Sequence, residues 1–123
     1  MASPNIVTAN AIIGRTTGVV LSNTSALLVL NNEQNSLSAY KINTVTMANR
    51  SNAVVTASLS WYNSANLQGT EFVIAANIAI PGLSSFTAID KQTQYYLDEN
   101  SSLGACTQTA SAIVVTASYE LIN

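Results

Sequence analysis

The amino-acid sequence predicts an all-β fold, an antiparallel β-sandwich or jelly roll of about eight strands in a single domain. Short runs in which apolar and polar residues alternate recur along the chain, as expected for half-buried strands. Turn segments rich in Asn, Ser and Gly separate these runs at intervals of roughly eight to twelve residues. No segment has the apolar spacing of an amphipathic helix, which argues against alternating strands and helices.

The first ten residues are expected to form an N-terminal arm, and the sandwich domain to span residues 11–123. The arm begins with Ser3-Pro4-Asn5, which interrupts regular structure, and continues with the apolar pair Ile6 and Val7. Two interpretations of the arm stay open. It frays, as chain termini commonly do, or it adds to the sheet of a neighbouring molecule and thereby buries Ile6 and Val7.

The start of the domain predicts a short hairpin followed by an apolar strand. Residues 11–13 and 19–21 flank a connection with Gly14 and Gly18 at its ends, which favours two short strands. No Gly-Lys-Ser/Thr follows these glycines, so a phosphate-binding loop is excluded. Residues 26–30 are wholly apolar and predict a strand covered on both faces.

Residues 41–63 predict a central β-hairpin, in which two strand-like runs are joined by a polar break at residues 49–52. The second run alternates with a period of two. The residues expected to face the core are Ala53, Val55, Ala57, Leu59 and Trp61. The residues expected on the opposite face are Thr56, Ser58, Ser60 and Tyr62.

Further strands are expected over residues 71–80, 84–89, 95–97, 103–107 and 112–122. In the first of these, alternation places Phe72 toward the core, and Pro81 ends the strand because proline cannot continue a ladder.

The composition combines a large apolar fraction with very little charge. Apolar residues make up 48% of the chain, but charged residues only 8%, against about 25% in a typical soluble protein. Hydroxyl and amide side chains cost less to desolvate than charges, so such a surface suits a subunit of an assembly. An ordinary neutral β-domain is the alternative. Four scattered basic residues cannot form the stripe that binds phosphates, so no direct contact with nucleic acid is expected.

The single cysteine, Cys106, excludes an internal disulfide and is expected to be a small buried apolar side chain. The N-terminal residues lack the features of an export signal. The longest wholly apolar run is far shorter than the roughly 20 residues that span a bilayer, so no membrane partner is expected.

The sequence predicts no catalytic site, cofactor or metal. It contains no histidine, which removes Ser-His-Asp triads, Cys-His pairs and most zinc sites. Six carboxylates remain, of which Asp98 and Glu99 are adjacent in a predicted turn and would diverge in an extended chain. Calcium bound by this turn is a minor alternative, because the acid spacing of an EF-hand is absent. We therefore expect the protein not to be an enzyme.

Exposed tyrosines give two alternatives for binding. Alternation places Tyr62 and one of Tyr95 and Tyr96 outward, where they would anchor a protein interface or stack on sugar rings. A protein interface is favoured, since the residue clustering of a saccharide groove is missing. The candidate interface residues are Ile6, Val7, Thr56, Ser58, Ser60, Tyr62, Tyr95 and Tyr96.

The order of these segments over residues 39–122 resembles that of small β-sandwich virion proteins of tailed bacteriophages and cyanophages. The similar segments are KINTVTMANRSN, AVVTASLSWYNS, a strand ending in Ile80-Pro81, YLDENSSL and VVTASYELI. The N-terminal third departs from that pattern, which leaves the mode of attachment open.

The resemblance implies a virion structural protein, assembled in the host cytoplasm, that binds itself as a homo-oligomer and binds other virion proteins. Capsid decoration is the first interpretation. A neck or tail component is the second, and a carbohydrate-binding module of a fibre is the alternative from another class.

Overall fold

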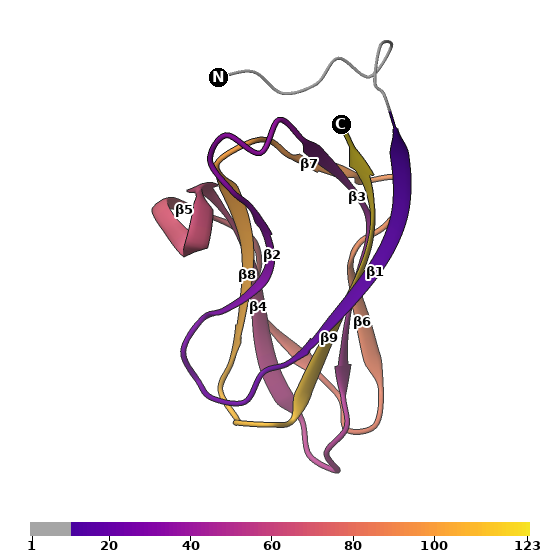
Figure 1. The fold of residues 1–123 in the computed structure, drawn as a ribbon. Coiled ribbons are helices and arrows are strands. Elements are labelled where there is room, and N and C mark those ends of the chain that lie inside the picture. Colours follow the sequence, from indigo (N-terminus) through magenta and orange to yellow (C-terminus); the bar gives the residue numbers. More distant parts are fainter. Residues whose placement is uncertain (1–10) are drawn as a thin grey trace.

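The computed structural model describes residues 11–123, which form two antiparallel β-sheets packed face to face (Figure 1). The predicted antiparallel β-sandwich is confirmed. A single turn of 3₁₀-helix, η2 (Ala65–Leu67), interrupts the strands. The strands within these residues are β1 (Ile12–Val20), β2 (Leu27–Asn32), β3 (Ala39–Asn49), β4 (Val55–Ser64), β5 (Gln68–Ile80), β6 (Ser85–Ile89), β7 (Tyr95–Leu97), β8 (Ser101–Thr107) and β9 (Ile113–Ile122).

The strand order is that of a jelly roll. The first sheet, sheet A, has the order β1-β9-β3-β6, and the second, sheet B, has the order β2-β8-β4-β5. β7 also pairs with β3, beyond β6 along the same strand, so β6 and β7 together occupy one position of sheet A. The chain therefore crosses between the sheets at six of the eight connections between these strands, as in the double-sheet jelly rolls.

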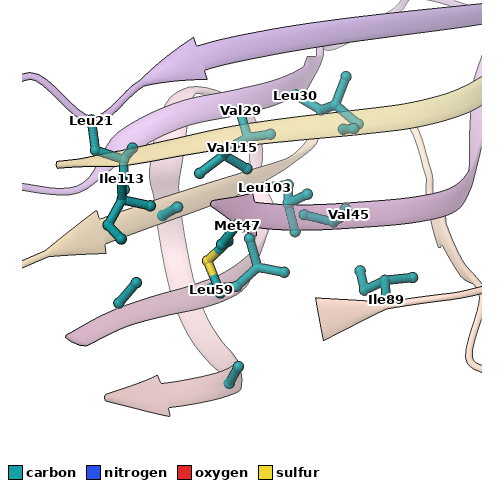
Figure 2. Close-up of a cluster of buried hydrophobic side chains, with 14 of the residues drawn as sticks. Leu21, Val29, Leu30, Val45, Met47, Leu59, Ile89, Leu103, Ile113 and Val115 are labelled. Atoms are coloured by element: carbon teal, nitrogen blue, oxygen red, sulfur yellow. The ribbon is translucent and has the colours of Figure 1, made fainter. Parts of the chain in front are cut away.

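The core lies between the inner faces of the two sheets. Figure 2 shows side chains from both sheets meeting there, with Met47 of β3 and Leu59 of β4 fully buried. Burial of each such large side chain contributes about 1.5–3 kcal/mol. Among the residues predicted to face inward, Val55, Ala57 and Leu59 are buried. Ala53 is exposed ahead of β4, so that part of the prediction is wrong.

The central hairpin predicted over residues 41–63 is wrong. Its two runs are strands, but β3 belongs to sheet A and β4 to sheet B, so they do not pair. The side chain of Asn49 holds the crossing between the sheets. Its amide donates to the carbonyl oxygens of Ala53 at 2.7 Å and Ile80 at 2.9 Å, and its oxygen accepts from the amide of Ser51 at 3.0 Å. A turn built this way redirects the chain instead of returning it alongside itself.

The short hairpin predicted around Gly14 and Gly18 is also wrong. β1 runs unbroken through both glycines and pairs with β9 along its whole length without a register shift. The positive φ that would favour a glycine turn is found at neither residue. The backbone ladder to β9 therefore overrides the local turn signal.

Two apolar segments are less covered than predicted, because each lies at a sheet edge. Leu28 of β2 is 38% exposed, and Phe72 of β5 is 47% exposed. The pairing of β4 with β5 shifts register at three places, which disturbs the alternation expected for residues 71–80. The later strands fall where the sequence predicts them. Within residues 11–123 no helix is both long and apolar enough to cross a membrane.

Replacing Asn49 by alanine is expected to lower the free energy of unfolding by about 1–3 kcal/mol, because the buried carbonyl of Ile80 loses its donor. Urea denaturation measures the change. The matched control is Asn52→Ala, at an exposed residue of the same connection, which should alter stability by less than about 0.5 kcal/mol. Equal effects of the two substitutions would show that the Asn49 amide does not hold the crossing.

Candidate assembly interface

The outward row of β4 runs along the middle of sheet B, between β8 and β5. Alternation directs Thr56, Ser58, Ser60 and Tyr62 away from the core, because Val55, Ala57 and Leu59 between them are buried. The sequence therefore placed these four side chains on the correct face.

Each hydroxyl in this row already has a partner on a neighbouring strand or loop. Thr56 donates to the side chain of Gln108. The Ser58 hydroxyl accepts from the amide of Asn77 at 2.8 Å. The Ser60 hydroxyl donates to Glu71 at 2.6 Å, and Ser60 is only 4% exposed. The hydroxyls of this face are thus fixed, the carboxylate of Glu71 is the charged group beside them, and Ser60 adds little exposed area.

Tyr62 lies against the sheet instead of projecting from it. A Cβ built at Gly104, which is opposite Ser60 on β8, would come within 2.6 Å of Cδ2 of Leu67 and 3.2 Å of Cε1 of Tyr62. Only glycine leaves room there for both side chains. The turn η2, which carries Leu67, is held by the Ser102 hydroxyl, which accepts from the Leu67 amide at 2.9 Å. Tyr62 is therefore half-buried.

Burial and the neighbouring carboxylate together make the Tyr62 phenol a weaker acid. Burial is the larger cause of its raised pKa, and the negative charge of Glu71 and a hydrogen bond to it add to the effect. The phenol of Tyr40, packed on Tyr119 with ring centroids 5.2 Å apart, also has a raised pKa, first through burial and then through Tyr119.

Tyr95 and Tyr96 lie on the other side of the molecule. They belong to β7 in sheet A and are 40% and 46% exposed. Tyr96 is paired with Lys41, whose ammonium group is 3.7 Å from the carboxylate of Glu120. Because the outer faces of two packed sheets point in opposite directions, Tyr96 forms no common surface with the β4 row. Alternation directs the adjacent Tyr95, which pairs with the buried Ile42, to the inner side of sheet A.

The predicted contacts at Ile6 and Val7 lie outside the described residues. The division into an arm over residues 1–10 and a domain over residues 11–123 stays a prediction.

The exposed apolar side chains at two sheet edges were not predicted from the sequence. β1 exposes Ile12 (56%), Ile13 (40%) and Val20 (38%), and β5 exposes Phe72 and Val73 (56%). Each of these strands ends the strand order of its sheet. The signal for β1 was the three pairs of β-branched residues, Ile12-Ile13, Thr16-Thr17 and Val19-Val20, which continue strand character across the glycines.

Five of the six carboxylates have a hydrogen-bond or ion-pair partner within residues 11–123. Glu71 and Glu120 bind Ser60 and Lys41, as described above. Glu33 accepts from Asn31 at 2.6 Å, Asp90 from the amide of Gln92 at 2.9 Å, and Glu99 from the amide of Leu37 at 2.9 Å. Within residues 11–123, no three acidic, Cys or His side chains are grouped in a way that could hold a metal ion.

Cys106 is half-buried and lies opposite Ser58, so it faces the outer surface of sheet B. The expectation of a buried apolar cysteine is therefore wrong.

Comparison with known proteins identifies a shared fold. No protein-family model matches the chain, and no curated protein matches it in sequence. Among solved structures, a chain of Bacillus endospore appendages, which form a family of disulfide-linked pili, has a TM-score of 0.52. The two are 12% identical, over 99% of this chain and 95% of that chain. The similarity extends across the whole sandwich.

The raised pKa of Tyr62 predicts a loss of stability in alkali. The folded state favours the neutral phenol, so its contribution is fully present below the unfolded pKa of about 10 and is lost as pH rises through the higher folded value. Above pH ~10, the free energy of unfolding should fall more steeply in the wild-type protein than in Tyr62→Phe. Denaturant titration at a series of pH values measures this difference, and parallel slopes would contradict it.

A pH titration of the Tyr62 phenol separates the effect of burial from the effect of Glu71. Glu71→Gln should lower the pKa of Tyr62, because it removes the nearby negative charge. The NMR shifts of the Tyr62 ring measure this pKa separately from those of the other four tyrosines. Tyr40 supplies the internal comparison, since Glu71 is not among the groups that shift its pKa.

Proposed function

We propose that this chain is a non-enzymatic structural protein that works by assembling with copies of itself. The observation that carries the proposal is the pair of edge strands β1 and β5, which expose apolar side chains next to backbone groups that no strand of residues 11–123 pairs. An uncovered edge of this kind is a template for pairing with another chain.

The rest of the surface is compatible with burial against a neighbour. Only 8% of the residues are charged. On the β4 face, the hydroxyls of Thr56, Ser58 and Ser60 already have hydrogen-bond partners within the chain. A neighbour that covers this face therefore leaves none of these three hydroxyls without a partner. A subunit with such a surface loses little on desolvation.

The setting we propose is a virion, in which the protein binds other virion proteins and decorates or cements the capsid. A neck or tail position is the second choice. The jelly roll is a fold of viral capsid domains. The Bacillus appendage protein shows that a chain of this fold is found in an assembled fibre, the pilus.

The absence of an enzymatic role is part of the proposal. Its support is that the chain has no histidine and that five of its six carboxylates already bind structural partners.

A carbohydrate-binding module is the alternative, and its support is now limited to β7. Tyr95 and Tyr96 are adjacent and exposed there, whereas Tyr62 is half-buried on the opposite sheet. A glycan array with the wild-type chain and with Tyr96→Ala decides this alternative: binding that is lost in the variant supports it, and no binding removes it.

The purified chain is expected to form oligomers or to coat particles. Light scattering coupled to size-exclusion chromatography measures the first, and co-sedimentation with capsids or tails the second. A monodisperse monomer without affinity for either would contradict the proposal.

Assembly is expected to be independent of disulfides within these residues. Because the 123 residues contain one cysteine, they can form at most one disulfide with another copy, which cannot link a chain of subunits. The oligomer distribution of Cys106→Ser should therefore match that of the wild-type protein, with or without a reducing agent. Dissociation of the oligomers on reduction would overturn this expectation.

A further inference from the structure

One edge of β1 is paired by no strand of residues 11–123, and this free edge presents a regular row of backbone groups. The Ala11 amide donates to the Asn123 carbonyl at 3.2 Å and the Asn123 amide donates to the Ala11 carbonyl at 3.1 Å, while the Leu21 amide donates to the Ile113 carbonyl at 2.9 Å. In an antiparallel ladder, bonded and non-bonded positions alternate. Odd-numbered residues from 11 to 21 therefore bond to β9. The residues that direct N–H and C=O to the free edge are Ile12, Gly14, Thr16, Gly18 and Val20.

The sequence of β1 is nearly the same read in either direction. It runs IIGRTTGVV and is centred on Thr16. Two such strands laid antiparallel about Thr16 place Ile12 opposite Val20 and Ile13 opposite Val19. They also place Gly14 opposite Gly18, and Arg15 opposite Thr17. Branched residues face branched residues, glycine faces glycine, and the Arg15 charges are diagonal and not directly opposite, which avoids the worst like-charge pairing.

We infer that two copies of this chain pair through their β1 edges, antiparallel, about a twofold axis at Thr16. In this register every residue that points to the free edge meets another such residue. Each of the five residues in one copy exchanges two hydrogen bonds with the residue opposite it in the other copy, which gives about ten backbone hydrogen bonds. The two A sheets then become one continuous sheet. The inference rests on the proposed function and names its partner as a second copy of the chain.

No contact within residues 11–123 explains the two glycines of β1. A Cβ added at Gly14 meets nothing within 4 Å, and one at Gly18 meets only the Val115 carbonyl at 3.6 Å. Neither has a positive φ. Glycine weakens a strand, and in strands it often marks the close approach of another backbone. In the inferred pairing, Gly14 and Gly18 of the two copies lie directly opposite each other.

The other long edge is less suited to such pairing. β5 carries Glu71 and shifts register against β4 at three places, and both features blunt an edge. β2 is short and has one register shift. β1 also carries one charge, Arg15, but it has no proline and no register shift along its nine residues. It is the edge that most closely matches a flat pairing strand.

The decisive substitution is Thr16→Pro. The N–H of Thr16 faces the free edge, so losing this N–H leaves the ladder between β1 and β9 intact. The proline ring, however, blocks the approaching strand of the second copy. Size-exclusion chromatography with light scattering should show loss of the β1-paired dimer, with circular dichroism as the check on folding. The matched control Thr16→Val keeps the backbone donor and should assemble as the wild-type protein does.

A thiol trap tests the register independently. In a Cys106→Ser background, Thr16→Cys places two thiols across the twofold axis with Cα atoms about 5.5 Å apart, within disulfide range. Mild oxidation should give a covalent dimer. The control Thr116→Cys is equally on the exposed outer face, but lies on β9 opposite Gly18. Its copy is three strand spacings across and four residues along the sheet, about 19 Å away, so it should not cross-link.

The outcomes separate this inference from the proposed function. Thr16→Pro that assembles like the wild-type protein, or Thr16→Cys that cross-links no faster than Thr116→Cys, overturns the β1 pairing while the assembly role stands. A wild-type chain that is monomeric and binds no particle overturns both.

Discussion

The packing of two apolar inner faces against each other is the constraint on which the rest of this structure depends. Neither sheet can bury its apolar face alone, so the chain crosses between the sheets at most of its connections. Asn49 shows what such a crossing requires locally. A buried amide is needed to satisfy the carbonyls of Ala53 and Ile80 where β3 ends and the chain passes to the opposite sheet.

A sandwich closed in this way still has strand edges, and these determine which surfaces are open to a partner. Barrel closure would remove the edges. Here β1 ends sheet A beside β9, and β5 ends sheet B beside β4. The apolar side chains of Ile12, Phe72 and Val73 are exposed at these edges and not on the broad face of β4. The interaction surface of this chain is thus set by topology, in addition to the polarity of its faces.

The sequence predicted the strands better than their partners. The period of two from Val55 to Tyr62 gave both the strand and its inward side, because alternation is a local property. Pairing is not local. The runs on either side of Asn49 have the pattern of a hairpin. They nevertheless belong to opposite sheets, because each run buries its apolar side chains against the other sheet. The glycines of β1 likewise resemble a turn until β9, nearly one hundred residues later, supplies a ladder for the whole strand.

A twofold contact through β1 closes on itself, so it produces a dimer and not a lattice. Assembly beyond the dimer then requires a second surface on each copy. Pairing through β1 leaves the outer face of sheet B uncovered, since that face lies across the sandwich from the continuous A sheets. The row formed by Thr56, Ser58 and Tyr62 lies on that face and is already rigid, because its hydroxyls are bonded to neighbouring strands and Tyr62 is packed over Gly104. A surface whose side chains are ordered in advance loses less entropy when a neighbour covers it. The two sheets would then differ in role: sheet A would join two copies by backbone hydrogen bonds, and sheet B would contact a further partner by side chains.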